Sequence, residues 1–185
     1  MIEITSEAIE RAETMLAGVP KGAERAFSNA INRAVIYSKT KAFKEVRKVY
    51  AVKQSDLNSK TATKVQKAST GSLVGHISFS GTKIPLYKFQ VTPKAPGKGK
   101  KVKAAVMKDG GATFDSAFIA NLGRGMGVFE RITSRRYPTK ELMGLSAGQM
   151  VQNEVIIDQL EKEAEEKVNE RVMHEIDRIL NGYGG

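Results

Sequence analysis

The sequence predicts an α+β fold in which an antiparallel β-sheet or sandwich core is flanked by N-terminal helices and a long C-terminal helix. Apolar residues recur with helical spacing at both ends of the chain, whereas short alternating segments separated by Gly, Pro and Ser fill the middle. The 185 residues are enough for one domain with its own core. We therefore expect a single domain over 1–185, with helices in 1–50, β-structure in 57–131 around a basic loop at 92–103, and a long helix over 146–181.

Two helices are predicted at the N-terminal end. Thr5 or Ser6 can cap a short helix that ends at Gly18, and a second helix is expected from residue 21 to about residue 50. The apolar face of this second helix consists of Ala23, Ala26, Phe27, Ala30, Ile31, Ala34, Val35, Phe43 and Val46. Small alanines beside larger apolar residues indicate close packing against another helix or a sheet.

Four segments in the middle of the chain are predicted to be strands. Residues 61–68 and 72–79 alternate between polar and apolar side chains, as half-buried strands do. Residues 84–91 are expected to form a third strand, in which Pro85 requires an edge or a strand start. A fourth is expected over 102–107. The segment that follows, 109–127, contains two Gly-rich turns that separate further apolar residues.

A lysine-rich loop joins the last two of these strands. Two prolines, two glycines and four lysines among residues 92–101 prevent a packed element and predict a long basic hairpin tip. The loop lies within a longer basic block, because residues 57–108 contain eleven lysines and no aspartate or glutamate. The residues proposed to contact DNA or a neighbouring subunit are Lys94, Lys98, Lys100, Lys101 and Lys103.

Three interpretations of this basic loop remain open. It could be a solvated hairpin tip, it could contact an acidic neighbour, or it could attract nucleic acid. Lysines without arginines or exposed aromatics favour non-specific phosphate attraction over base reading.

The C-terminal segment is predicted to be one helix of about 35 residues, about 50 Å long. Ser146 can cap its start, and Gln149 is placed to complete a capping box. Its glutamates, including Glu163 and Glu175, are expected to form a solvated face, while its apolar stripe covers the sheet or another subunit. The residues proposed for a subunit interface are Ile157, Leu160, Glu161, Glu165, Val168, Val172 and Ile176.

Catalytic and metal-binding signatures are missing from the sequence. The chain has no cysteine, and its two histidines, His76 and His174, lack ligand spacing. The glycines of 123–127 do not follow a strand and open a helix as a dinucleotide loop does. We therefore expect no enzyme activity, no metal and no cofactor.

Membrane and export signals are missing as well. No apolar run approaches the length of about 18 residues that spans a bilayer, so no membrane partner is expected. Residues 1–5 have neither the basic nor the apolar region of a signal peptide, which predicts production in the host cytoplasm.

An ordered series of short motifs resembles the minor tail protein Z family of tailed bacteriophages and prophages. The series runs through Ile84-Pro85-Leu86 and Phe89, the lysine-rich loop, Ala117-Phe118-Ile119-Ala120, Gly127-Val128-Phe129-Glu130-Arg131, Arg135-Arg136-Tyr137-Pro138, Leu142-Met143-Gly144-Leu145-Ser146 and His174-Glu175-Ile176. At 144–146 the family pattern is Gly-Pro-Ser, and this chain keeps the capping serine without the proline. The resemblance covers nearly the whole chain.

The resemblance implies a tail completion role in the virion. Such proteins act at the head-proximal end of the tail, where they support head–tail joining and genome positioning. It also implies a ring of identical subunits, commonly six-fold, with tail terminator, tube and head–tail connector proteins as neighbours and DNA nearby. A non-specific nucleic-acid-binding protein that uses the lysine-rich loop is the alternative from a different class.

Overall fold

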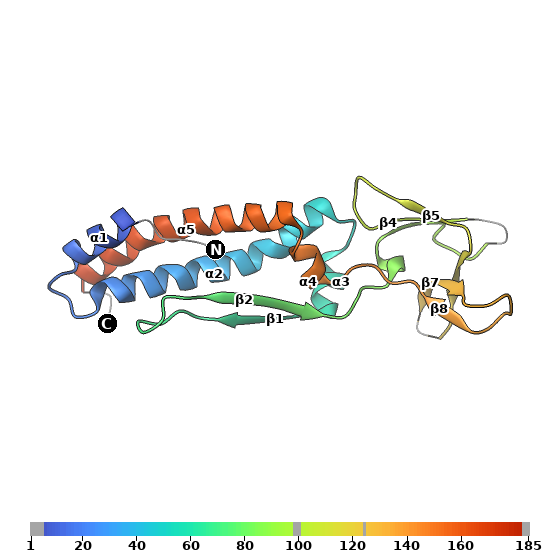
Figure 1. Cartoon of the computed structure of the whole chain (residues 1–185), viewed down its shortest axis with the longest axis horizontal. Coiled ribbons are helices and arrows are strands. Elements are labelled where there is room, and N and C mark those ends of the chain that lie inside the picture. Colours follow the sequence, from blue (N-terminus) through green and yellow to red (C-terminus); the bar gives the residue numbers. More distant parts are fainter. Residues whose placement is uncertain (1–5, 98–100, 124, 183–185) are drawn as a thin grey trace. The chain divides into compact units, whose positions relative to one another are not determined.

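The structure of the chain is a computed structural model that describes residues 6–97, 101–123 and 125–182 (Figure 1). Its helices are α1 (Ser6–Met15), α2 (Gly22–Val49), α3 (Gln54–Lys60), α4 (Ala147–Val151) and α5 (Glu154–Leu180), with a short 3₁₀ helix η1 (Leu86–Lys88). Its strands are β1 (Thr61–Gln66), β2 (His76–Gly81), β3 (Gln90–Thr92), β4 (Val102–Ala105), β5 (Ala112–Phe114), β6 (Ala117–Asn121), β7 (Met126–Arg131) and β8 (Thr139–Glu141). These helices and antiparallel sheets confirm the predicted α+β class.

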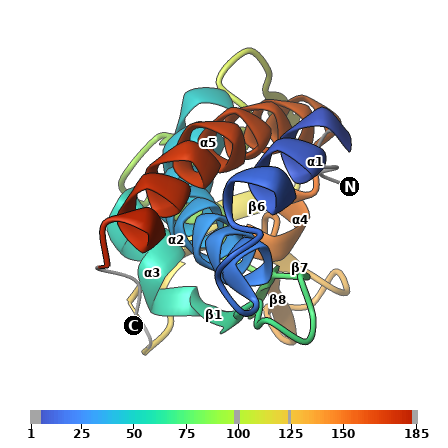
Figure 2. The same cartoon turned by 90° about the vertical axis from the view of Figure 1, so that its left-hand side faces the viewer.

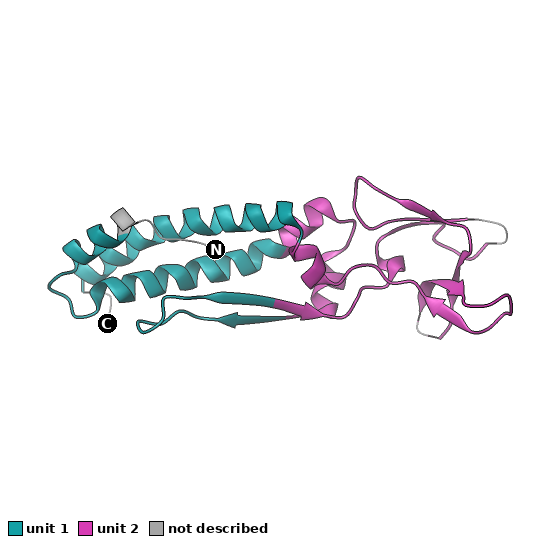
Figure 3. Ribbon diagram, viewed as in Figure 1, with its two compact units in different colours: residues 1–42, 63–78, 153–185 teal, residues 43–62, 79–152 magenta. Residues whose placement is uncertain are grey.

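The chain divides into two compact units (Figure 3). Unit 1 comprises residues 1–42, 63–78 and 153–185, and unit 2 comprises residues 43–62 and 79–152. Their boundaries fall within α2 and within the β1–β2 hairpin. Whether 1–185 acts as a single tail-completion domain stays a prediction.

The core of unit 1 lies between α1, α2 and α5 (Figure 2). Its buried side chains are Ala12 and Leu16 of α1, Ala26, Phe27, Ala30 and Ala34 of α2, and Val168, Val172, Ile176 and Ile179 of α5. The alanines recur at steps of four along α2, so that they line one helical face. Because an alanine side chain is short, the larger side chains of α5 can pack close to the α2 backbone, as the sequence pattern predicted.

The β1–β2 hairpin of unit 1 is attached to α2 by an amide pair. The Nδ2 of Asn32 donates to the carbonyl oxygen of Ala68 at 3.0 Å, and the Ala68 N–H donates to Oδ1 of Asn32 at 2.8 Å. Gly75 lies against Ile31 and Val35, where a Cβ would come within 3.0 Å of both side chains. The missing side chain therefore permits this close approach between hairpin and helix.

Two antiparallel three-stranded sheets form most of unit 2. Their strand orders are β3-β4-β5 and β6-β7-β8. Backbone hydrogen bonds continue after β8: the Leu142 N–H donates to the carbonyl oxygen of Val128 in β7 at 2.8 Å, and the Gly144 N–H donates to the carbonyl oxygen of Ile84, also at 2.8 Å. The fully buried side chains of this unit include Leu57, Ile84, Val91, Val102, Val128 and Met150.

The predicted single helix over 146–181 is wrong, because α4 ends at Val151 and α5 begins at Glu154. Ser146 and Gln149 do form the predicted capping box at α4. At the break, Asn153 has an extended backbone, and its Oδ1 accepts a hydrogen bond from the Val155 N–H at 3.2 Å. A new N-cap thus starts a second helix although the apolar spacing continues across the break.

Two strand predictions also need correction. Residues 86–88 form a 3₁₀ helix instead of a strand. Leu86 and Phe89 are both buried although they are three residues apart. A strand would place two such residues on opposite faces, whereas a 3₁₀ helix places them on the same side. The strand expected over 72–79 occupies 76–81 instead, and Leu73 is exposed. Gly81 is the last residue of β2.

Candidate interaction surfaces

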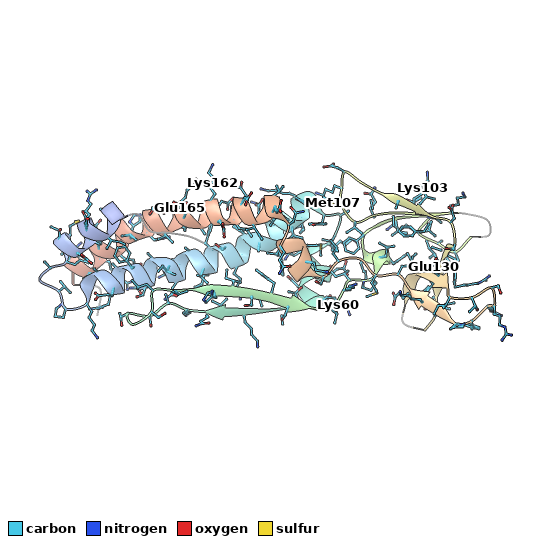
Figure 4. All side chains as sticks on the ribbon, in the orientation of Figure 1. Lys60, Lys103, Met107, Glu130, Lys162 and Glu165 are labelled. Atoms are coloured by element: carbon cyan, nitrogen blue, oxygen red, sulfur yellow. The ribbon has the colours of Figure 1, made fainter. Side chains whose placement is uncertain are left out.

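The lysine-rich loop connects β3 to β4 as a hairpin. The two strands pair antiparallel, with Thr92 opposite Lys103, which confirms the hairpin inferred from the sequence. Lys98 and Lys100 lie outside the described residues. Lys103 is exposed on β4 (Figure 4).

Two other lysines of the loop make contacts within unit 2. The Nζ of Lys94 lies 3.5 Å from the carbonyl oxygen of Phe89 and 5.5 Å from the ring centre of Tyr87, whose hydroxyl donates to the Lys94 carbonyl. The Nζ of Lys101 lies 2.7 Å from Oδ1 of Asp115, and this hydrogen bond raises the pKa of Lys101. Both partners of that ion pair are mostly exposed, so salt will screen their attraction. The described lysines therefore do not converge on one point.

The residues proposed for a subunit interface on α5 fall into two groups. Val168, Val172 and Ile176 are buried in the core of unit 1, and Ile157 and Leu160 are half-buried. Glu161 and Glu165 are exposed, and Figure 4 shows Glu165 on α5 beside Lys162. Because the buried members already pack within the chain, an interface on α5 must use the exposed residues.

Two glutamates predicted for the solvated face of α5 instead contact α2. Glu175 is 5% exposed, and its Oε2 accepts a hydrogen bond from Asn29 at 3.3 Å. Glu163 is half-buried, and its Oε2 lies 3.2 Å from Nζ of Lys41. The prediction of exposure is wrong for both residues because each carboxylate has polar partners on the neighbouring helix.

Several polar groups converge on Glu163. Its Oε1 accepts from Gln159 at 2.9 Å, and its Oε2 accepts from the hydroxyl of Tyr37 at 3.2 Å. The hydrogen bond from Gln159, followed by the contact with Lys41, lowers the pKa of Glu163 despite its partial burial. Hydrogen bonds to Tyr37 and Glu163 raise the pKa of Lys41. Lys167 also lies 5.7 Å from the ring centre of Tyr37.

A cavity of about 360 Å³ opens on unit 2. Its lining residues are Lys60, Thr82, Lys83, Pro85, Leu122, Gly125, Phe129, Glu141 and Met143. Leu122 and Met143 remain 43% and 42% exposed, so the cavity presents apolar side chains to solvent. Sequence reasoning missed this site because its residues come from several separate segments. The pairing of Pro85 with Met143 brings two of those segments together.

The connection between β7 and β8 carries exposed apolar and basic side chains. Ile132 is 62% exposed and Tyr137 is 59% exposed, and the guanidinium of Arg136 lies 5.6 Å from the Tyr137 ring centre. Arg135 is also exposed. Arginine and tyrosine are common at interaction surfaces, so the Arg-Arg-Tyr sequence was the available signal for this surface.

Within 6–97, 101–123 and 125–182, no three His, Asp or Glu side chains are grouped as metal ligands would be. No helix in the described part of the chain is both long enough and apolar enough to cross a membrane.

Comparison with known proteins identifies a family. The profile of a family described as prophage minor tail protein Z (GPZ) matches residues 6–183. The match extends over both compact units. No curated protein and no solved structure matches the chain.

Proposed function

Because the chain belongs to the prophage minor tail protein Z family, we propose that it is the tail completion protein of its virion. In this proposal, copies of the chain assemble as a ring, with six-fold symmetry the first expectation, at the head-proximal end of the tail. The ring supports head–tail joining and genome positioning. The family match over 6–183 is the single observation that carries the proposal, and it supports a structural role in a phage tail.

The charge distribution supports self-assembly in this proposal. The middle of the sequence is basic without acidic residues, whereas the exposed side of α5 carries Glu161 and Glu165. A ring requires two different surfaces on each subunit that fit each other head to tail. Surfaces of opposite charge favour such a contact and set its orientation. Tail terminator, tube and head–tail connector proteins are the proposed neighbours above and below the ring.

Electron microscopy of phage particles tests the proposal directly. A C-terminal fusion to a small, dense protein should add density as a ring where the tail meets the head. Deletion of the coding sequence should leave filled heads and tails that do not join. A protein that sediments as a monomer at all concentrations and is missing from purified particles would overturn the proposal. Assembly occurs in the host cytoplasm in this scheme, so tails should be recovered from lysed cells.

Non-specific nucleic-acid binding is the second candidate function. The observation that favours it is the exposed Tyr137 beside Arg135 and Arg136, which provides the stacking surface and guanidinium groups that the lysine loop lacks. In the tail, such contacts would accompany the passage of DNA.

Salt titration of duplex binding tests this second candidate. The affinity should fall steeply as salt rises, and the double variant Lys101→Gln/Lys103→Gln should reduce the slope by about two, one for each lost phosphate contact. Tyr137→Ala should weaken single-strand binding more than duplex binding. Lys162→Gln on α5, which removes one positive charge outside the loop, serves as the control for net charge and should leave the slope unchanged. Binding that is independent of salt and of these lysines would exclude this candidate.

A further inference from the structure

We propose that the cavity of unit 2 receives the first turns of α5 from a second copy of the chain, with Val155 entering the cavity. This inference rests on the proposed self-assembly. It identifies the two surfaces through which neighbouring copies would contact each other. It assigns a role to this cavity and to Val155, the most exposed large apolar side chain of the described residues.

The cavity combines an apolar interior with lysines. Leu122, Phe129 and Met143 supply apolar surface, and two of these three side chains are more than two-fifths exposed. Lys60 and Lys83 also line the cavity and are exposed. A volume of about 360 Å³ lies at the small end of the range for binding sites, which suits a branched aliphatic side chain with part of its helix. The cavity therefore fits an apolar group that is accompanied by carboxylates.

The start of α5 has this combination of groups. Val155 is 69% exposed, and Glu154 and Asp158 beside it are exposed as well. Residues three or four apart are neighbours on a helix surface, so Asp158 lies next to both Val155 and Glu154. Further along the same side, Glu161, Glu165 and Glu166 are exposed, with Lys162 among them. An apolar side chain with two neighbouring carboxylates, Glu154 and Asp158, thus lies on a predominantly acidic helix face.

The helix start and the cavity complement each other in polarity and in charge. Val155 can contact Leu122 and Met143 while Glu154 and Asp158 face Lys60 and Lys83. Glu141 also lines the cavity and would repel a carboxylate that came close to it.

The contact is heterologous, since a cavity on one copy meets a helix on the next. Such contacts continue around a ring when the rotation between subunits closes. A two-fold dimer would instead place the helix of each copy in the cavity of the other at the same time. The proposed occupant is therefore a second copy, and capture of a different acidic protein by the cavity is the outcome that would contradict it.

Disulfide trapping tests the contact with the full chain. The protein contains no cysteine, so each single-cysteine variant has one thiol. Val155→Cys and Leu122→Cys should form a disulfide-linked dimer when mixed under oxidising conditions, and neither variant should do so to the same extent alone. Leu180→Cys provides the matched control, because Leu180 is a 50% exposed apolar residue at the other end of α5. Equal cross-linking of Leu122→Cys to both α5 positions would overturn the proposed contact.

A charge swap supplies a second measurement that does not depend on disulfide geometry. Lys60→Glu/Lys83→Glu should weaken self-association by at least about tenfold, since like charges then face each other. Glu154→Lys/Asp158→Lys should have the same effect, and mixing the two variants should restore association. Lys64→Glu/Lys67→Glu is the control for a general change in net charge. Loss of association without rescue in the mixture would contradict the pairing.

The results separate this inference from the proposed function. If rings form and are seen at the tail, but neither trapping nor charge rescue occurs, the proposed function stands and the proposed contact is wrong. If no variant or wild-type protein self-associates, and none enters particles, the ring itself is refuted. Circular dichroism of each variant shows whether it is folded before association is measured.

Discussion

The hydroxyl of Tyr37 in α2 donates a hydrogen bond to the Glu163 carboxylate in α5 at 3.2 Å. The same carboxylate oxygen lies 3.2 Å from the ammonium group of Lys41, one turn farther along α2. Tyr37 and Glu163 are separated by 126 positions in the sequence, so this contact joins the two longest helices. It lies beside the apolar core of unit 1 and adds polar contacts with defined geometry to packing that is otherwise non-directional.

Removing the Tyr37 hydroxyl should weaken unit 1. The substitution Tyr37→Phe keeps the ring but removes the hydrogen bond to Glu163, and it should lower the free energy of unfolding by about 1 kcal/mol. Urea titration followed by circular dichroism measures the change. The control is Tyr137→Phe, which alters an exposed ring in unit 2 and should leave stability unchanged. Equal effects of the two substitutions would refute the structural role of the Tyr37–Glu163 contact.

Acid should destabilise unit 1 through Glu163. The pKa of this carboxyl group in the folded chain lies below the ordinary value of 4.5, so the unfolded chain takes up the proton more readily. The stabilisation is therefore complete above that value and is lost as the pH falls through the pKa of the folded state. Glu163→Gln should flatten the pH dependence of unfolding in this acid range, whereas Glu165→Gln on the exposed side should not. An unchanged acid slope in Glu163→Gln would contradict the assignment.

The cap at Asn153 should contribute to the stability of α5. Asn153→Ala removes the side-chain acceptor of the Val155 N–H and should reduce the free energy of unfolding by about 1 kcal/mol. Asn153→Asp retains an acceptor and adds a negative charge at the helix N-terminus, so it should preserve stability. Chemical denaturation of both variants distinguishes capping from a general effect of substitution, because only the alanine variant should lose stability.

Gly81 should not tolerate a side chain. A Cβ at this position would overlap the carbonyl oxygen of Lys60, so Gly81→Ala must displace backbone at the end of the β1–β2 hairpin. We expect a loss of about 1–3 kcal/mol in unfolding free energy, as for other overpacked sites. Gly71→Ala is the matched control, because nothing lies within 4 Å of a Cβ there. The prediction would be wrong if Gly81→Ala were as stable as the wild type and the hydrogen-exchange rates of its hairpin amides were unchanged.

Local patterns predicted helices and several strands well. The alanine series from Ala26 to Ala34 correctly indicated a closely packed helix, since periodicity of 3.6 residues depends only on neighbours in the sequence. The capping box of Ser146 and Gln149 was likewise identified from residue types at a fixed spacing. The break at Asn153 was missed because apolar spacing continues across it. The signal was available, because Asn followed by Glu154 is a common helix start.

The proposed sites depended more strongly on tertiary structure. The charge of the basic hairpin was evident from the sequence, but the contacts of Lys94 with Tyr87 and of Lys101 with Asp115 were not. Val168 and Val172 were proposed for a subunit interface, yet the structure packs them against α1 and α2 in the core of unit 1. Hydrophobic spacing identifies a face that must be buried but does not identify what buries it.

By itself, the sequence determined the α+β class, the helical ends, the basic hairpin and the resemblance to a family of phage tail proteins. These features depend on residue order and on spacing over a few turns or strands. Tertiary structure alone decided which glutamates of α5 contact α2 and which remain exposed, and it alone brought Leu122, Met143 and Lys60 around one cavity. Such arrangements depend on contacts between distant segments, whose geometry is set by packing of the whole unit and not by local preference.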